Sequence, residues 1–492
     1  MSNTEVSTPA QRWSFFAVIS LGLLMIGLDN SILYTALPEL NEQLHTTPTQ
    51  GLWIINAYPL ALAGLLLGTG TLGDKIGHRL MFIIGLVLFG LASLAAAFAP
   101  TAWLLVGARG LLGVGAAFMM PATLALIRLT FSNERERNTA IGIWGSVAVV
   151  GAALGPVVGG ALLEVFWWGS IFLINVPIVI IALGLTLWLA PENMPNPQKH
   201  WDFISSIYAL FALSGLVMAI KEAANPNSGW TLFSVAAALC VIGAVLFVRR
   251  QNKLEDPLLT FDIFKSRMFA GGVIAAGGGM FFMAGSEMMT TQKLQLVDGF
   301  TPLHAGATII AMAIAAIPAS TLGGAYLHKI GFLPLIGGGF LGAVVGAGLL
   351  IWGSEAGSYG IEIVALAIMG FSAGSVMSVS SIAIIGAAPL HRSGMAAGVE
   401  EVSYEFGTLL TVAITGSLLP MWLIQHLPDN LKDLGLDAVY NPETNPIAAP
   451  AYADAYHQVL MVLAGAALLF GVATWWCFRD NPKSGDIHVA HE

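Results

Sequence analysis

Residues 70–79 read Gly-Thr-Leu-Gly-Asp-Lys-Ile-Gly-His-Arg. This short stretch is rich in glycine and charge, and it separates two long apolar runs. Residues 324–331 repeat it in degraded form as Gly-Ala-Tyr-Leu-His-Lys-Ile-Gly, again between two apolar runs. The shared Lys-Ile-Gly recurs after 254 residues. The chain is therefore predicted to contain two related halves that run in the same direction.

The composition around these stretches is that of a membrane protein. Of the 492 residues, 10% are charged and 56% are hydrophobic. A soluble domain normally carries about 25% charged residues, so water cannot solvate most of this chain. Apolar runs of about 20 residues are long enough to cross a bilayer, and in lipid such runs form helices. The predicted fold class is an all-α membrane protein.

The apolar runs predict an even number of spans. Fourteen are expected, at 13–36, 51–72, 80–99, 102–126, 139–162, 168–190, 203–220, 230–248, 268–292, 303–327, 333–353, 361–385, 394–424 and 457–478. Because the two Lys-Ile-Gly stretches follow spans two and ten, spans one to six and nine to fourteen are equivalent. The predicted organisation is a half at 1–195, two inserted helices within 196–262, and a half at 263–492 with a long external loop at 425–456.

The distribution of Lys and Arg orients these spans. With the N-terminus in the cytoplasm, sixteen of the 20 basic residues fall in cytoplasmic segments. Three, Lys221, Lys293 and Lys432, fall at the external ends, and Arg109 falls inside a span. Positive charge is enriched in cytoplasmic loops, so both termini are predicted to be cytoplasmic.

Several functional classes are disfavoured. The net charge is −9 and no stretch is strongly basic, so nucleic-acid binding is not expected. Cys240 and Cys477 lie in apolar spans, which predicts neither a disulfide framework nor a metal site. The chain lacks the glycine-rich phosphate loop of a fused ATPase. The residues up to Arg12 lack a signal-peptide cleavage signature, so the first run is expected to be a retained span.

Four segments resemble motifs of the major facilitator superfamily. Residues 70–79 resemble its signature loop, and 109–115 (Arg-Gly-Leu-Leu-Gly-Val-Gly) are similar to its proton-coupling motif. Residues 151–160 (Gly-Ala-Ala-Leu-Gly-Pro-Val-Val-Gly-Gly) are similar to its antiporter motif, typical of exporters. Residues 28–38 (Leu-Asp-Asn-Ser-Ile-Leu-Tyr-Thr-Ala-Leu-Pro) resemble the signature of the fourteen-span drug–proton antiporters. This resemblance implies two six-helix halves plus two inserted helices.

Within that family the chain is most similar to the QacA/SmvA type. The resemblance implies proton-coupled export of quaternary ammonium compounds, methyl viologen, cationic dyes and bisbiguanides, by a monomer in the bacterial cytoplasmic (inner) membrane. The expected partners are cationic drugs, protons and membrane lipids, with no cofactor besides the coupling proton and no enzymatic activity. The chain departs from some relatives, because Asn56 stands where they carry an acid and span ten has no acid at all.

Three alternatives remain open at this point. The same fold could export a metabolite, siderophore or peptide, although an anionic cargo would require basic groups and only Arg109 lies within a span. A membrane enzyme would require a buried nucleophile–base pair or His/Asp cluster, and most of the ten histidines lie in loops or tails. A sensor or scaffold would not require acids within the spans.

An ionisable group in hydrocarbon is costly and is a functional candidate by default. The spans hold Asp29, Arg109, Glu287, Glu400, Glu401 and Glu405. Asp29 and Arg109 each lie about 10 Å from the external ends of their spans, from the helical rise per residue. In the superfamily both spans line the central cavity, so the two side chains are predicted to face each other. Together they form either a proton-coupling site or a permanent structural ion pair.

The acids of span thirteen are the second candidate. Glu401 and Glu405 are one helical turn apart and share a face, whereas Glu400 points about 100° away. Two ionised carboxylates on one face would repel, so at least one is expected to hold a proton. Glu401 and Glu405 are therefore proton-coupling candidates, and Glu405 also suits a counter-charge for a cation. The alternative for Glu400 and Glu401 is hydrogen bonding to neighbouring helices.

A cation site is predicted from further acids, thioethers and aromatic rings. Glu287 lies among methionines, whose soft side chains suit a flat lipophilic cation. Alternatively, Glu287 is an interfacial acid near Lys293. Together with Asp29 and Glu405, the predicted substrate-binding residues are Glu287, Trp53, Tyr58, Phe281, Met283 and Tyr404.

Two glycine-containing segments are assigned to conformational switching. In the signature loop, Gly70, Asp74, Gly77 and Arg79 are expected to clip the halves together when the external side is open. In span five, Gly155, Pro156 and Gly159 allow close helix packing and a bend, since small residues let backbones approach each other in lipid.

Overall fold

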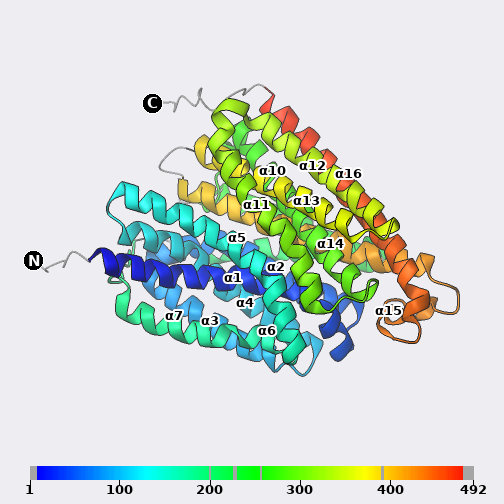
Figure 1. The fold of residues 1–492 in the computed structure, drawn as a ribbon. Helices are drawn as coiled ribbons and strands as arrows, with labels where there is room; N and C mark the ends of the chain where they lie inside the picture. The colour runs from blue at the N-terminus through cyan, green and yellow to red at the C-terminus, as the bar shows by residue number, and fades with distance from the viewer. Residues whose placement is uncertain (1–7, 199–200, 225–229, 255–256, 389–392, 480–492) are drawn as a thin grey trace, which may run out of the picture.

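A computed structural model describes residues 8–198, 201–224, 230–254, 257–388 and 393–479, and every regular element in them is helical. The first part of the chain forms the N half (Figure 1), which consists of α1 (Pro9–Gln43), α2 (Pro48–Ile76), α3 (His78–Ala97), α4 (Ala102–Thr130), α5 (Glu134–Val165), α6 (Ser170–Leu173) and α7 (Asn175–Leu189). Within this half α1 packs on α5, and α4 packs on α2 and α3.

The inserted pair consists of α8 (Phe203–Ala224) and α9 (Trp230–Gln251). After the short helix η1 (Phe261–Lys265), the C half consists of α10 (Arg267–Leu296), α11 (Pro302–Ile330), α12 (Phe332–Glu355), α13 (Tyr359–Ala387), α14 (Ser393–His426), η3 (Lys432–Leu434), α15 (Asp437–Tyr440) and α16 (Asn445–Phe478). Within this half α13 packs on α11 and α12, and α10 packs on α14 and α16.

The described residues contain twelve helices long and apolar enough to cross a membrane, and α2, bent by 59° near residue 67, raises this to thirteen. Helices α6 and α7 count together as one of the twelve. For α5 the apolar stretch within the described residues is shorter, Leu154–Val165. The all-helical fold with at least twelve spans is therefore established, while the number fourteen stays a prediction.

The repeat found in the sequence has the same structure in both halves. Helices α2 and α11 each begin behind a threonine, Thr47 and Thr301, whose side chain accepts a hydrogen bond from the backbone of the first turn. Each helix ends at a glycine, Gly77 (φ +95°) or Gly331 (φ +92°), and the next helix begins at once. A side chain is strained in this backbone region, so glycine is required. The 254-residue offset holds at both ends of the helix.

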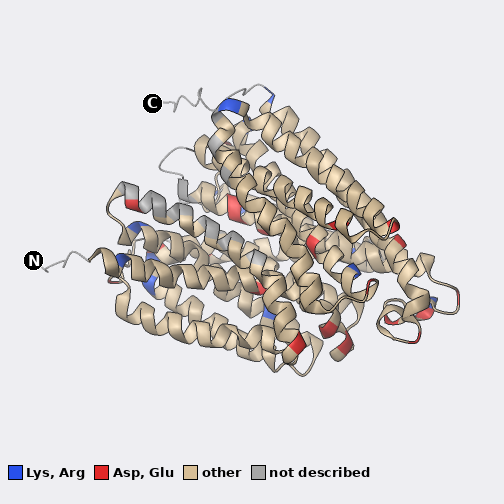
Figure 2. Ribbon diagram, viewed as in Figure 1, with Lys and Arg blue, Asp and Glu red and all other residues tan. Residues whose placement is uncertain are grey.

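The termini share one end of the bundle. Helix α1 begins and α16 ends at the same end, which we call the terminal end, and the α1–α2 loop and α15 lie at the opposite, far end (Figure 1). Figure 2 shows more of the Lys and Arg residues at the terminal end and more of the Asp and Glu residues at the far end. This separation of charge follows the distribution predicted from the sequence.

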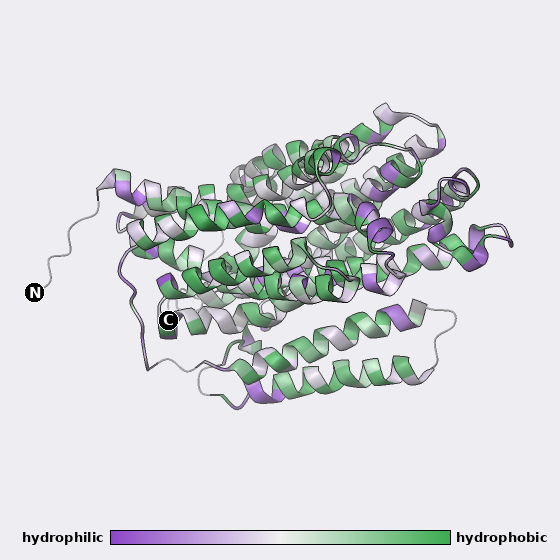
Figure 3. Cartoon of the chain, turned by 90° about the horizontal axis from the view of Figure 1, so that it is seen from below, coloured by the Kyte–Doolittle hydropathy of each residue, from purple (hydrophilic) through white to green (hydrophobic). Residues whose placement is uncertain are grey.

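The inserted pair lies at the edge of the bundle. Figure 3 shows it as two mostly hydrophobic helices beside the two halves. Only α8 contacts the halves substantially, and it touches α2 of the N half and α14 of the C half. Its contact with α2 is tight, because Gly64 and Gly68 lie directly against Leu210 and Ser206. Most apolar side chains of α9 are exposed, as expected for a helix that faces lipid.

The structure differs from the sequence-based prediction in two elements. Span six is broken into α6 and α7, because Pro177 has no N–H to donate to the carbonyl of Leu173. The predicted external loop 425–456 is shorter than expected, since α16 already begins at Asn445. Proline suggested a loop there, but Pro446 lies in the first helical turn, where proline is tolerated, and the segment is rich in alanine.

Candidate functional site

An ion pair between α1 and α4 is buried in the N half. Arg109 Nη1 donates to Asp29 Oδ2 at 2.6 Å, and both side chains are 0% exposed. Arg109 Nε also donates to the carbonyl of Ile54 in α2 at 3.2 Å. The prediction that Asp29 and Arg109 face each other is confirmed. Their role in proton coupling stays a prediction.

The second carboxylate oxygen of Asp29 is bound from α7. Asn175 Nδ2 donates to Asp29 Oδ1 at 2.8 Å and to Ser93 Oγ of α3 at 3.3 Å. Asn175 is the first residue of α7, directly after the break that divides span six. The N half therefore surrounds Asp29 with groups from three other helices, and in this conformation Asp29 has no contact with solvent.

Tyr58 belongs to the same group. The Arg109 guanidinium lies 4.7 Å from the centre of the Tyr58 ring, which is the geometry of a cation–π interaction. Tyr58 is 0% exposed, so in this conformation its ring is occupied by Arg109 and cannot stack on a drug. Trp53, one and a half turns earlier on α2, is half-buried and packs against the main hydrophobic core.

The three acids of α14 have different surroundings. Glu400 accepts hydrogen bonds from the Tyr404 hydroxyl (2.8 Å) and from Ser381 of α13, which is the interhelical role considered for it from the sequence. Glu401 is partly exposed and lies within electrostatic range of Glu400 and Glu405. Glu405 is buried, and its Oε2 has no hydrogen-bond partner among the described residues. Tyr404 is committed to Glu400.

Glu287 of α10 lies on the side of the C half that faces the N half. It is 8% exposed and, like Glu405, lies within electrostatic range of the Tyr34 hydroxyl of α1. Lys293, considered from the sequence as its neighbour, is instead paired with Glu362 and Asp298, each at 2.7 Å. Glu287 is therefore not the carboxylate that neutralises Lys293.

Two other predicted substrate residues lie in packing positions. Phe281 makes an edge-on contact with Phe470 of α16, with ring centres 5.7 Å apart. Phe470 in turn packs on Phe340 of α12, so this aromatic group lies within the C half. Met283 is half-buried against the main hydrophobic core. The described contacts of Phe281 and Met283 support packing and give no separate support for cation binding.

The signature loop is held by the N half. Asp74 Oδ1 lies 3.0 Å from His78 Nε2, and Arg79 donates to the carbonyl of Leu187 at the end of α7. Asn193, in the linker after α7, donates to the carbonyl of Ile76 and accepts from the backbone N–H of Leu80. A Cβ on Gly77 would overlap the Asn193 amide. Gly70 lies one turn before Asp74 and faces open space.

The glycines of α5 make the closest contact between the halves. Gly155 and Gly159 lie directly against Ser31 and Ile32 of α1. On the opposite half, a Cβ on Gly306 of α11 would overlap the carbonyl of Pro156. Here the two backbones meet without a side chain between them, as the small residues of this segment predict.

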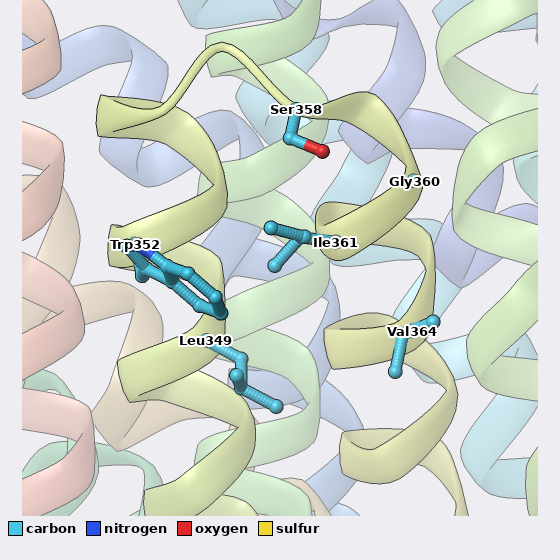
Figure 4. A pocket seen from close by; sticks show the side chains of 6 residues that line it. All are labelled: Leu349, Trp352, Ser358, Gly360, Ile361 and Val364. Atoms are coloured by element: carbon cyan, nitrogen blue, oxygen red, sulfur yellow. The ribbon is translucent and has the colours of Figure 1, made fainter.

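A groove elsewhere on the surface is not part of this site. It lies between α12 and α13, has a volume of about 380 Å³, and is lined by Leu349, Trp352, Ser358, Gly360, Ile361 and Val364 (Figure 4). None of these residues is charged. Trp352 and Val364 are more than half exposed on the outside of the bundle, where lipid would surround a membrane protein. Among the described residues no group of three or more His, Cys, Asp or Glu could hold a metal ion.

Sequence reasoning missed several residues that the fold brings to the site. Asn175 is the only amide in span six and lies two residues before a proline, which was the available signal. Tyr34 gave no distinct signal within its mostly apolar span. The pairing of Lys293 with Glu362 joins residues 69 positions apart, which no local pattern specifies.

Comparisons with known proteins agree with this arrangement. The family model described as Major Facilitator Superfamily matches residues 19–412. The chain is 36% identical to the methyl viologen resistance protein SmvA of Salmonella typhimurium, over 83% of each chain. It is 38% identical to the multidrug efflux pump LfrA of Mycolicibacterium smegmatis, over 84% of this chain and 81% of that relative.

Solved structures share the fold at low sequence identity. A bacterial homologue of the human lysosomal transporter Spinster aligns with a TM-score of 0.69 at 14% identity, covering 96% of this chain and 98% of that chain. The nucleoside transporter NupG aligns with a TM-score of 0.63 at 13% identity, covering 94% and 100%. With a family model that matches most of its length and relatives above 30% identity, the chain belongs to the Major Facilitator Superfamily.

Proposed function

We propose that this protein exports lipophilic cations in exchange for protons. The observation that carries the proposal is that Glu287 and Glu405 are buried carboxylates without a basic partner among the described residues. A buried charge without a partner is strongly unfavourable, so each carboxylate must hold a proton or lie beside a cation. A site that accepts one or the other is the basis of antiport.

The names of the relatives support this class of cargo. SmvA is named for resistance to methyl viologen, and LfrA is named a multidrug efflux pump. We infer that quaternary ammonium compounds, methyl viologen, cationic dyes and bisbiguanides are cargo of this chain too. Glu287, Glu405 and the Tyr34 hydroxyl provide an aromatic, acidic site between α1, α10 and α14 that would suit them.

The proposed cycle couples the two ions by competition. A cation entering between the halves displaces the proton from Glu405 or Glu401, the halves rock, and external protons then displace the cation. Each unit charge that crosses 100 mV contributes about 2.3 kcal/mol, so the membrane potential also drives the exchange of a proton for a cation of different charge. Asp29 and Arg109 provide a second proton-coupling site in the N half.

The membrane arrangement is part of the proposal. We infer fourteen spans, with α5 and the bent α2 as the two beyond the twelve, and both termini in the cytoplasm of a bacterial cell. The halves touch toward the far end, where Asn41 donates to the Tyr440 hydroxyl at 2.9 Å and Gln295 donates to the Thr35 carbonyl. With cytoplasmic termini, this conformation is closed to the exterior. The monomer is the proposed functional unit.

The signature loop is proposed to control switching. Asp74 and Arg79 lie at the terminal end, where they can clip the halves together once the far end has opened. In the closed-outside conformation their partners His78 and Leu187 belong to the N half. The rival cargo, an anionic metabolite or siderophore, is less well supported because Arg109, the basic residue buried in the N half, is already bound by Asp29.

Ethidium efflux tests the proposal. The gene would be expressed in a bacterial host without its main efflux pumps, and ethidium loss would be followed with and without an uncoupler. We expect faster efflux than in the vector control and its loss with the uncoupler. Glu287→Gln and Glu405→Gln should each lower efflux at equal protein level, whereas Glu355→Gln, an exposed acid of α12, should not. Equal efflux in vector and wild-type cells would contradict the proposal.

A further inference from the structure

Asp29 is bound on both oxygens by groups of different kinds. Oδ2 accepts from Arg109, which is a permanent donor, since guanidinium does not lose its proton in proteins. Oδ1 accepts from the amide of Asn175, which has both a donor and an acceptor end. If Asp29 takes up a proton, Oδ1 is the oxygen that can carry it, because Oδ2 faces the Arg109 donor.

The amide of Asn175 is held at one end only. Its Nδ2 donates to Asp29 and to Ser93, while its buried Oδ1 has no hydrogen-bond partner among the described residues. A half-turn of the amide would therefore break no bond at Oδ1 and would place Oδ1 where Nδ2 now lies. There it could accept from a protonated Asp29 and from the Ser93 hydroxyl, which can donate as well as accept.

We infer that Asn175, supported by Ser93, is a positioning residue that serves Asp29 in both its ionised and its protonated form. The inference deepens the proposed function, since it rests on Asp29 as a proton carrier. With Asp29 ionised, Asn175 donates through Nδ2. With a proton on Oδ1, the amide turns, its Oδ1 accepts, and Ser93 changes from acceptor to donor. One proton enters the carboxylate, and only hydrogen bonds change.

The other groups around Asp29 cannot take over this role. Among the described residues, the titratable groups near Asp29 are Arg109 from α4 and Tyr58 from α2. Helix α5 faces α1 through Gly151, Gly155 and Gly159, which offer no side chain. On the C half, Glu287 of α10 and Glu405 of α14 lie near Tyr34 and Tyr58 rather than at Asp29. Asn175 is thus the neutral partner that can adapt to the carboxylate.

Drug-induced proton release measures the effect. Tetraphenylphosphonium would be added to the purified protein in weakly buffered detergent solution, and released protons would be followed with a pH dye from pH 5 to 9. Asn175→Leu fills the space but serves neither form of Asp29. The ionised form loses the stronger bond, so the pH midpoint of release should move upward by about one unit. Ser93→Ala should move it in the same direction by less.

The control separates positioning from mere stability. Thr186→Val removes one hydrogen bond from another fully buried side chain of α7, which donates to the Ala182 carbonyl and does not touch Asp29. It should lower thermal stability without moving the midpoint. Asn175→Gln, which keeps both ends of the amide, should restore much of the wild-type profile.

The outcomes distinguish the two proposals. If Asp29→Asn abolishes release while Asn175→Leu and Ser93→Ala keep the wild-type midpoint, the inference is overturned and the proposed function stands. If wild-type protein releases no protons on addition of tetraphenylphosphonium, the proposed function fails and the inference fails with it. A shifted midpoint in either variant, together with an unshifted Thr186→Val, supports positioning.

Discussion

The guanidinium of Arg109 rests on the Tyr58 ring while it donates to Asp29, so the ring sets where the ion pair can form. Tyr58→Phe keeps the ring and should retain ethidium efflux within about twofold. Tyr58→Leu removes a buried cation–π interaction of about 0.5–2 kcal/mol and should lower efflux by about two- to thirtyfold. Initial efflux rates at equal protein level measure this. Equal losses in both variants would instead assign the effect to the hydroxyl.

The acids of α14 should differ in the same assay. Glu400 is hydrogen-bonded by Tyr404 and Ser381, and glutamine can accept the same bonds, so Glu400→Gln should have little effect. Glu405 has no such partners among the described residues. If it holds the cation or the proton, Glu405→Gln should lower efflux by about ten- to a hundredfold, the loss of a charge-assisted contact. A larger loss in Glu400→Gln would reverse the assignment.

At the scale of elements, the glycine between consecutive helices is the part of the repeat that the backbone requires. Gly77→Ala and Gly331→Ala would each force a side chain into a region reserved for glycine, at a cost of about 1–3 kcal/mol. Gly348→Ala, in the middle of α12 where a Cβ meets nothing within 4 Å, serves as the control. Thermal unfolding of the purified variants should show lower stability for the first two only.

The inserted pair is closed at the terminal end by a salt bridge. Arg250 of α9 donates to Asp202, which lies just before α8. Burial alone would raise the pKa of Asp202, but hydrogen bonds from Arg250 and Ser205 lower it below its usual 3.8. Its stabilising effect is therefore present at neutral pH and is lost as the pH falls below 3.8 through the pKa of the folded state.

The pH dependence of one variant checks this. Wild-type protein should unfold at a higher temperature than Asp202→Asn at neutral pH, and the difference should shrink below pH 3.8. Asp429→Asn removes an exposed carboxylate paired with Lys432 and should not change the unfolding temperature. A stability difference for Asp202→Asn that persists at the lowest pH would contradict the role of the charge.

Local patterns predicted the elements well where hydrophobicity and caps coincide. The runs that became α3, α4 and α12 were placed within a few residues, because each is apolar throughout and ends at a polar turn. The start of α16 was missed because Pro446 and Pro450 were read as a loop signal. The Asp29–Arg109 pair could be predicted from depth alone, whereas the contacts of Asn175 depend on how α7 is turned, which no periodicity specifies.

For the molecule as a whole, the contact between Pro156 and Gly306 is where the halves lie closest. Gly306→Leu should separate α5 and α11 and favour opening at the far end. With Cys240 and Cys477 replaced by alanine, a cysteine introduced for Asn41 would report this opening. Its labelling by an impermeant maleimide should rise in Gly306→Leu and ethidium efflux should fall. Gly348→Leu, which faces open space, is the control. Unchanged labelling would contradict the idea that this contact closes the far end.

The position of the inserted pair has a mechanical consequence for the bilayer. Helix α8 is seated tightly on α2 through Gly64 and Gly68, and it also touches α14 of the other half. When the halves rock, the seam between α8 and α14 must widen or narrow, and acyl chains border it along α9. Each turnover then changes the cross-sectional area of the protein at that seam. Lateral pressure and acyl-chain length thereby enter the free energy of the conformational change.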